Sequence, residues 1–349
     1  PFSSSTADTM SKKNNSIPTS QPGLFDILDD KLSAIQQELP VHPSIEDFIV
    51  ETKKITQPEV PPHTNLLEEP VDVDHRPRQA ILFRSFGSGS SGNCAFIGDR
   101  SGGILIDAGV DAKTVIQHLK TMDMTMDDIH GICLTHDHGD HVRCVYSLVR
   151  RHNHIKVFCT PKTFSGIMRR HSMSRRLKDY HQPIYKEFPF RIGPFEITAF
   201  EVSHDGTDNA GFFISSGNLK FAVATDLGCI SERVDHYMRQ ANFIVIESNY
   251  DETMLREGPY PSYLKARIAA PNGHLDNKET ARYLAEIRTP ELKNIFLCHL
   301  SRDNNTPSLA LTTVAQALGI TPGEPHIPGT LRLEVLPRFD ASPLYILRK

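Results

Sequence analysis

Short blocks of hydrophobic residues, separated by polar or glycine-rich segments, run from residue 80 to residue 348. The continuous apolar runs at 103–106, 129–134 and 294–298 predict buried strands. Hydrophobic residues at helical spacing over 112–121 predict an amphipathic helix. A series of glycine-turn hairpins followed by strand–helix units occurs roughly twice along the chain. This order predicts an α+β chain with two β-sheets packed face to face and helices outside.

The first part of the chain lacks this pattern. Residues 1–75 hold 13 acidic and 5 basic side chains, so their net charge is -8. Residues 76–349 hold 29 acidic and 33 basic side chains, so their net charge is +4. Frequent proline and few apolar residues indicate a largely disordered segment. We therefore expect a flexible, acidic, proline-rich extension over 1–76 and a folded catalytic domain over 77–349.

The cysteines and the hydropathy pattern favour a cytoplasmic location. The six cysteines have no C-x-x-C pair, and several lie inside apolar runs, which is typical of reduced, buried thiols. No stretch reaches the length of a transmembrane helix, and the N-terminus lacks a signal-peptide pattern. We expect no membrane association.

A histidine-rich segment at 135–141 follows the apolar run 129–134 directly. Imidazole and carboxylate groups at this spacing suit zinc, manganese or iron(II). Charged carboxylates beside an apolar strand need compensation, which a cation provides. A polar surface loop is the alternative, and it would explain a lone H-x-H better than it explains H-x-H-x-D-H. The candidate ligands are His136, His138, Asp140 and His141.

Four more polar residues follow predicted strands: Asp107, His204, Asp226 and His299. Strand ends converge at one edge of a sheet while their loops stay free, so we expect these side chains to meet the histidine-rich segment. Taken singly, His204 is equally well explained as a hydrogen-bonded strand-end histidine and Asp226 as a turn cap. Their order after the segment favours a metal-binding role.

Polar groups outside this set are candidates for contacting a substrate. Ser90, Ser91 and Asn93, in the glycine- and serine-rich turn 87–93, could donate hydrogen bonds to phosphate, although an ordinary turn explains them equally well. His274 precedes a predicted helix, where it could bind phosphate and protonate a leaving group; a loop histidine near a cap is the alternative. Asn304 is a weaker candidate of the same kind.

The segment from Arg143 to Lys178 holds ten Lys and Arg residues and no Asp or Glu. Such a run is usually a solvated face. Placed directly after the metal motif and without opposing acids, it favours a groove that follows a phosphate backbone. Phe164 and Tyr180 could stack on bases. No pattern separates DNA from RNA, because recognition of the 2′-hydroxyl leaves no readable motif.

The motif T-H-x-H-x-D-H, an earlier I-D-A-G strand and the later pairs S-H, T-D and C-H occur in an order that resembles the metallo-β-lactamase fold superfamily. The resemblance spans residues 79–320 and implies a four-layer αββα sandwich with two divalent metal ions, Zn²⁺ or Mn²⁺. It implies that Asp107 braces the site by hydrogen bonds. The implied ligands are His136, His138 and His204 for one ion, Asp140, His141 and His299 for the other, and Asp226 between them.

Four further segments resemble the YycJ/WalJ-like exonuclease branch: 87–93, 247–249, 273–275 and 298–307. This resemblance implies 5′-to-3′ exonuclease activity on DNA, with Asp140, Asp226 and His274 as catalytic residues. The superfamily also contains hydrolases of small esters, lactones and thioesters and RNA-processing nucleases, so these remain alternatives. A binding module that retained the fold is another, which the complete ligand set disfavours.

The N-terminal extension contains one candidate docking peptide. The sequence Q-P-G-L-F at Gln21–Phe25 resembles the peptide by which bacterial proteins bind the replication sliding clamp. Disordered tails often carry such peptides. An ordinary amphipathic turn is the alternative explanation.

Overall fold

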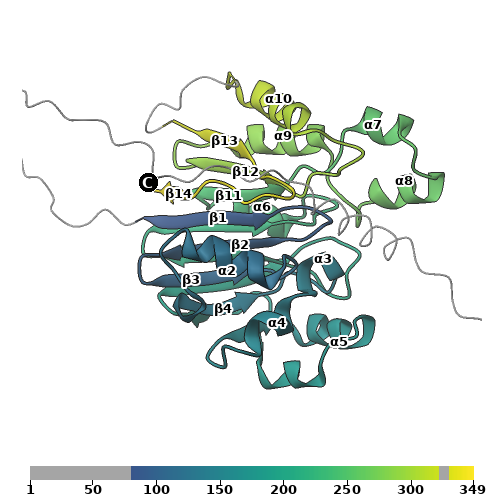
Figure 1. Cartoon of the computed structure of the whole chain (residues 1–349). Coiled ribbons are helices and arrows are strands. Elements are labelled where there is room, and N and C mark those ends of the chain that lie inside the picture. The colour runs from purple at the N-terminus through teal and green to yellow at the C-terminus, as the bar shows by residue number, and fades with distance from the viewer. Residues whose placement is uncertain (1–79, 322–329) are drawn as a thin grey trace, which may run out of the picture. The chain divides into compact units, whose positions relative to one another are not determined.

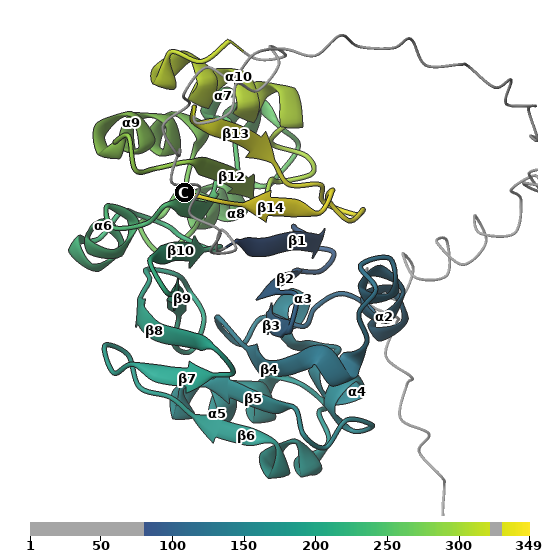
Figure 2. The same cartoon turned by 90° about the vertical axis from the view of Figure 1, so that its left-hand side faces the viewer.

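The computed structural model describes residues 80–321 and 330–349, so the predicted extension and the segment Gln21–Phe25 lie outside the described residues. Two sheets of seven strands each form the body (Figures 1 and 2). Sheet one holds, in spatial order, β14 (Tyr345–Leu347), β1 (Ile81–Gly87), β2 (Cys94–Asp99), β3 (Gly102–Ile106), β4 (Ile129–Cys133), β5 (Lys156–Cys159) and β6 (His181–Pro183). Sheet two holds β13 (Arg332–Val335), β12 (Asn294–Cys298), β11 (Phe243–Glu247), β10 (Leu219–Ala224), β9 (Ala210–Ser216), β8 (Phe195–Glu201) and β7 (Phe190–Ile192).

Parallel pairing determines where the loops of each sheet gather. Strands β3, β4, β5 and β6 pair in parallel in sheet one, and β10, β11, β12 and β13 do so in sheet two. The carboxyl ends of parallel strands lie at the same edge of a sheet. The segments that follow β3, β4, β10, β11 and β12 therefore leave their sheets at shared edges.

A hydrophobic core lies between the two sheets. The ring of Phe83 on β1 lies 5.2 Å from the ring of Phe221 on β10 and 4.6 Å from that of Phe296 on β12. All three side chains are fully buried. Tilted aromatic pairs at this spacing add about 0.5–1.5 kcal/mol beyond burial. These contacts confirm that the sheets pack face to face, as the sequence predicts.

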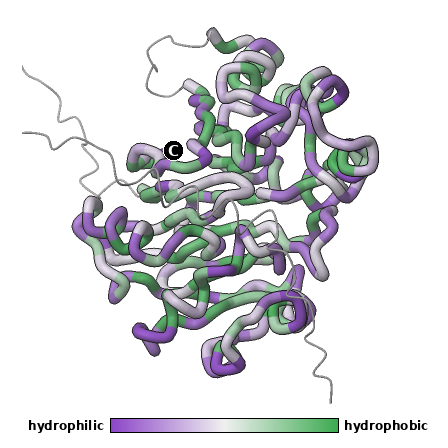
Figure 3. Tube along the Cα trace, turned by 45° about the vertical axis from the view of Figure 1, so that its right-hand side comes forward, coloured by the Kyte–Doolittle hydropathy of each residue, from purple (hydrophilic) through white to green (hydrophobic). Residues whose placement is uncertain are grey.

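Helices cover the outer faces, which completes the predicted αββα sandwich (Figure 1). In Figure 3 the strands carry long hydrophobic stretches while the helices alternate hydrophobic and hydrophilic positions. Sheet one is covered by α2 (Ala112–Lys120), α3 (Gly139–Val142), α4 (Val145–Val149) and α5 (Pro161–Arg170), and sheet two by α6 (Glu232–Met238), α9 (Asn277–Ile287) and α10 (Pro307–Leu318).

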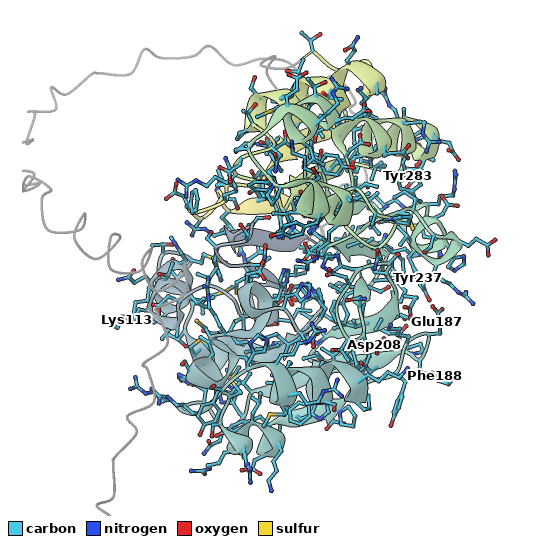
Figure 4. All side chains as sticks on the ribbon, turned by 90° about the vertical axis from the view of Figure 1, so that its right-hand side faces the viewer. Lys113, Glu187, Phe188, Asp208, Tyr237 and Tyr283 are labelled. Atoms are coloured by element: carbon cyan, nitrogen blue, oxygen red, sulfur yellow. The ribbon has the colours of Figure 1, made fainter. Side chains whose placement is uncertain are left out.

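Helix α6 is tied to the turn before β7 by one hydrogen bond. Tyr237 on α6 donates its hydroxyl to a carboxylate oxygen of Glu187 at 2.8 Å (Figure 4). The neighbouring Phe188 is 69% exposed and projects from this turn.

Among the described residues, no helix combines the length and apolar character needed to cross a membrane.

The predicted helix at 112–121 is present as α2, whose first turn is capped by the side chain of Asp111. The sequence did not predict α5, α7 (Glu252–Glu257) or α8 (Ser262–Ile268). Helix α8 has no buried side chain, so it carries no apolar face for a periodicity to mark. Short helices of this kind form because of their surroundings rather than their hydrophobic pattern.

Candidate metal centre

The histidine-rich segment leaves the end of β4 and turns into α3. Cys133, at the end of β4, is fully buried, and His138 occupies the position before the first residue of α3. The backbone N–H of His141 donates to the carbonyl of His138 at 3.0 Å. The strand end and this single helical turn therefore place the side chains of the segment on one compact loop.

Three histidines form the first candidate ligand group. His136, His138 and His204 each offer a ring nitrogen, and these nitrogens lie within 4.8 Å of one another. His204 follows β8 in sheet two, and its Nδ1 lies 2.9 Å from the carbonyl oxygen of Gly273. That contact orients the ring and leaves Nε2 directed at the group, where it lies 3.3 Å from Nδ1 of His138.

A second candidate group joins Asp140 and His141 from sheet one to His299, which follows β12 in sheet two. Asp226, which follows β10, lies between the two groups. Its Oδ2 is 2.6 Å from Nε2 of His141 and 3.3 Å from Nε2 of His136, and its Oδ1 contacts Nδ1 of His299. The structure thus brings together all seven candidate ligands that the sequence suggested.

Two buried nitrogens in these groups lack hydrogen-bond partners. Nε2 of His136 and Nε2 of His299 are both enclosed, and neither accepts nor donates a hydrogen bond. A buried polar atom without a partner costs about 1–3 kcal/mol. Imidazole nitrogens converging with carboxylate oxygens are ligands for a divalent cation, and a cation would satisfy both atoms. The residues present therefore fit the metal ions that the superfamily implies.

The charges of His136 and Asp226 suit a cation. Burial, followed by the nearby His141, holds the pKa of His136 well below its usual range, so this ring is neutral. Burial alone would raise the pKa of Asp226, but attraction to His299 and His141 outweighs it and lowers that pKa well below the usual range. Neutral imidazole and ionised carboxylate are the forms that bind metal. Burial alone would lower the pKa of His141 and His299, but the charge of Asp226 outweighs it and raises both well above the usual range, so these two rings must give up a proton to bind metal.

Asp107 makes the bracing contact that the resemblance implies. Its Oδ2 lies 2.7 Å from Nδ1 of His141, and its Oδ1 accepts a hydrogen bond from the backbone N–H of Thr135 at 2.8 Å. The residue has a φ of 63°, a left-handed conformation that aspartate tolerates better than most residues. Asp107 therefore fixes the orientation of the His141 ring and of the loop that carries it.

Glu247 belongs to the site, although no residue pattern predicted a role for it. It is fully buried at the end of β11, and its Oε1 lies 2.8 Å from Nδ1 of His274 and 2.8 Å from Nδ1 of His299. Its Oε2 accepts backbone N–H groups from Leu227 and Leu275. One signal was available: an acid closes the all-apolar strand F-I-V-I-E, as Asp107 and Asp226 close theirs.

His274 stands at the edge of the two ligand groups. Its ring centroid lies 5.0 Å from that of His204 and 5.4 Å from that of His299. Its side chain is 22% exposed, more than that of Asp226 or Glu247. Because Glu247 engages Nδ1, the remaining ring nitrogen, Nε2, is free to face a substrate.

The candidate substrate contacts separate into exposed and buried residues. Ser90 and Ser91 are exposed at the tip of their turn. The Asn93 amide is buried, with Nδ2 2.9 Å from Nε2 of His141, so it supports the metal centre. Asn304 is fully buried, and its carbonyl accepts the N–H of Asp251. These enclosed positions argue against direct substrate contact by Asn93 or Asn304.

The ten basic side chains between Arg143 and Lys178 are all exposed. Arg170 on α5 approaches the buried Asp137 of the histidine-rich segment at 3.4 Å, which links the basic helix to the metal loop. The expectation for Tyr180 is wrong, because its ring is buried and its hydroxyl donates to Asn153. Phe164 stacks on His181 with ring centroids 4.0 Å apart.

Comparisons with known proteins agree with this geometry. The family described as Beta-lactamase superfamily domain matches residues 103–299. The exodeoxyribonuclease YycJ of Bacillus anthracis is 34% identical over 244 residues, which cover 68% of this chain and 89% of that protein. The exodeoxyribonuclease WalJ of Streptococcus pneumoniae is 30% identical over 232 residues, 66% and 86% of the two chains.

Among solved structures, the metallo-β-lactamase fold protein YhfI from Bacillus subtilis superposes with a TM-score of 0.55. It is 12% identical and covers 76% of this chain and 99% of its own, so it supports the fold alone. The sequence identity to YycJ and WalJ places the chain more narrowly. The chain belongs to the metallo-β-lactamase fold superfamily, in the branch that contains YycJ and WalJ.

Proposed function

We propose that the protein is a metal-dependent exonuclease that degrades DNA from its ends in the 5′-to-3′ direction. The observation that carries the proposal is the buried cluster of histidines and acids in which His136 and His299 keep unpartnered ring nitrogens. Membership of the YycJ and WalJ branch supports the exonuclease class, since both relatives are named exodeoxyribonucleases.

We further propose that two divalent ions, Zn²⁺ or Mn²⁺, occupy the centre. When bound, such ions lower the pKa of a coordinated water and neutralise charge on a phosphodiester. Asp140 and Asp226 supply the negative charge that retains cations, and Asp226 lies between the two groups. The ligands are His136, His138 and His204 on one side, Asp140, His141 and His299 on the other, and Asp226 between them.

His274 is the residue we assign to the leaving group. Glu247 holds its Nδ1 at 2.8 Å, so the ring is oriented and Nε2 is the atom that can donate a proton. Its partial exposure keeps it accessible from outside the cluster, whereas the proposed metal ligands His136 and His141 are enclosed. Asp226 can accept a proton from the attacking oxygen.

A polyanionic substrate agrees with the surface charge. Ten exposed basic side chains follow the metal loop along the chain, and no acid lies among them. A small lactone or thioester would gain little from such a surface, whereas a phosphate backbone is attracted along its length. DNA is favoured over RNA by the names of the two relatives.

Degradation of end-labelled single- and double-stranded DNA and RNA, with Mn²⁺ or Zn²⁺ supplied, tests the proposal. We expect DNA to be shortened from its 5′ end and Asp226→Ala to lose more than ~100-fold of this activity, since it removes the carboxylate between the ligand groups. Hydrolysis of a lactone or thioester without any cleavage of nucleic acid would refute the function. Full nuclease activity in Asp226→Ala would refute the site.

Two proposals concern the whole chain. Residues 1–76 form an extension of the catalytic domain 77–349, and Gln21–Phe25 docks on the sliding clamp of replication. The acidic, proline-rich composition of 1–75 and the Q-P-G-L-F sequence support them.

The six cysteines carry free thiols, which agrees with a reducing, cytoplasmic location.

A further inference from the structure

The turn Gly87–Asn93 is fastened directly to the metal centre. The Asn93 amide nitrogen lies 3.2 Å from a carboxylate oxygen of Asp140, and the N–H of His299 donates to the hydroxyl of Ser88 at 3.0 Å. These contacts tie the turn to both sheets. The exposed tip of the turn, Ser90 and Ser91, lies between Ser88 and Asn93, the two residues that contact the ligand group of Asp140, His141 and His299.

Two glycines of this turn make room for two arginines. A Cβ on Gly89 would lie 3.1 Å from Cγ of Arg338, and a Cβ on Gly92 would lie 2.8 Å from the carbonyl oxygen of Gly109 and 3.0 Å from Nη2 of Arg143. Arg143 is held there because its Nε donates to the same Gly109 carbonyl at 2.8 Å. Arg338 follows β13, and Arg143 follows α3. The glycines thus allow an arginine to lie against each side of the turn, next to its serine tip.

The guanidinium of Arg338 has unused hydrogen-bonding capacity. Its Nη1 is buried without a hydrogen-bond partner, although a guanidinium N–H is a strong donor. Burial, and then the nearby charge of Arg302, lower the pKa of Arg338. The opposing Asp303 already accepts a hydrogen bond from the Tyr260 hydroxyl at 2.7 Å. Asp303 offsets part of the positive charge of Arg302 and Arg338, and the unpartnered Nη1 of Arg338 remains available to donate to an anion.

We propose that Arg338 and Arg143, with the hydroxyls of Ser90 and Ser91, bind a phosphate group of the substrate next to the phosphodiester held at the metal centre. This pocket adds a substrate-binding site to the proposed nuclease, and it rests on that proposed function. Guanidinium groups bind phosphate through paired N–H donors, and serine hydroxyls complete such a site. The group is either the terminal phosphate of the strand or a phosphate of its backbone, and the two sources give different results below.

The test compares Arg338→Gln and Arg143→Gln with Arg191→Gln in the full chain loaded with metal. Arg191 is the control, because it is exposed, pairs with Glu196 at 3.1 Å and lies by the β7–β8 turn, at the opposite end of sheet two. We expect each pocket variant to raise KM for a DNA oligonucleotide about 10-fold or more, the effect of one charge-assisted hydrogen bond. Metal content, thermal midpoint and kcat stay near wild type, and Arg338→Lys recovers part of the loss.

Oligonucleotides with 5′-phosphate and 5′-hydroxyl ends identify the phosphate. A KM increase confined to the phosphorylated oligonucleotide indicates the terminal group, and an equal increase for both indicates the backbone. A wild-type protein that cleaves the DNA while both variants keep its KM would overturn the pocket and leave the nuclease function intact. A wild-type protein that cleaves no nucleic acid would instead overturn the function.

Discussion

At the scale of single residues, Glu247 shows how the site is held in place. One buried carboxylate lies against the two histidines His274 and His299 and also accepts two backbone N–H groups. Burial alone would raise the pKa of Glu247, but attraction to His274 outweighs it and lowers that pKa. The charged carboxylate therefore acts through its neighbours: it orients a proposed metal ligand and the proposed proton donor together.

Replacing Glu247 by Gln keeps the shape of the side chain and removes its charge. Because hydrogen bonds to charged groups contribute about 1.5–3 kcal/mol, we expect a lower free energy of unfolding. Nuclease activity should fall about 10- to 100-fold, the usual effect of removing a residue that orients a ligand. Bound metal per chain, measured together with the rates, should fall as well. Glu291→Gln, at an exposed acid, is the control, and unchanged metal content and rate in Glu247→Gln would contradict the assigned role.

The residues of the site differ in how visible they are in the sequence. His136 to His141 stand together and carry a specific pattern. Glu247 acquires its role from contacts that span 27 residues to His274 and 52 to His299, which no local pattern records. Asn93 and Asn304 were predicted to contact the substrate, but both are buried. Composition alone could not tell an exposed turn amide from a buried one.

At the scale of elements, the segment after β3 and the start of α3 meet backbone to backbone. The N–H of Ala108 donates to the carbonyl of His141 at 2.7 Å, and the carbonyl of Ala108 accepts the N–H of Cys144 at 2.9 Å. The carbonyl of Asp140, at the start of α3, accepts the N–H of Asn93 at 2.8 Å. A Cβ on Gly109 would lie 1.6 Å from that carbonyl oxygen of Asp140, which is far inside contact distance. The glycine of the D-A-G motif is thus required by the close approach of two backbones.

Gly109→Ala should separate these two segments. We expect a loss of stability of at least ~1–3 kcal/mol, the usual cost of overpacking, and weaker metal retention because Asp140 and His141 must move. Thermal unfolding with and without added metal measures both effects. Gly139→Ala is the matched change in the facing segment, at the first residue of α3, since its Cβ would meet only His171, at 3.5 Å. Equal stability of the two variants would show that the close approach is not limiting.

Several strands and helices were predictable because their periodicity reflects burial, whereas the ten-residue helix α5 was not predicted. The predicted strand at 294–298 is β12, and the predicted helix at 112–121 is α2 within one residue. The helices α7 and α8 were not, because together they bury only Leu255 and leave no repeating apolar face. What periodicity cannot give is the pairing of distant strands, as in β14 with β1.

At the scale of the whole molecule, the metal centre joins the two sheets. Its proposed ligands come from the end of β4 in sheet one and from segments after β8, β10 and β12 in sheet two. The order of elements predicted two sheets packed face to face and the strand ends were expected to converge, but the division of the ligands between two metal ions came from the family resemblance rather than from residue patterns. Within a single chain of 349 residues, packing between sheets therefore decides whether the ligands meet.

The proposed clamp contact belongs to this scale, because it joins the extension to another protein. A pull-down of full-length protein on sliding clamp should retain the wild type and lose most of the binding when Leu24 and Phe25 are changed to Ala. Apolar anchors supply most of the affinity of such short peptides. Nuclease activity should be the same in both proteins, since the catalytic domain is unchanged. Equal retention of the two proteins would sink the idea.

Two residues of the site have a left-handed backbone conformation that lowers stability, while their side chains are needed for function. Asp107 has a φ of 63° and His299 a φ of 52°, conformations that each cost L-residues about 1–3 kcal/mol. Glycine would adopt either conformation without this strain, but it would remove the bracing carboxylate or the imidazole. Selection for a more stable fold and selection for a working centre therefore act in opposite directions at these two positions.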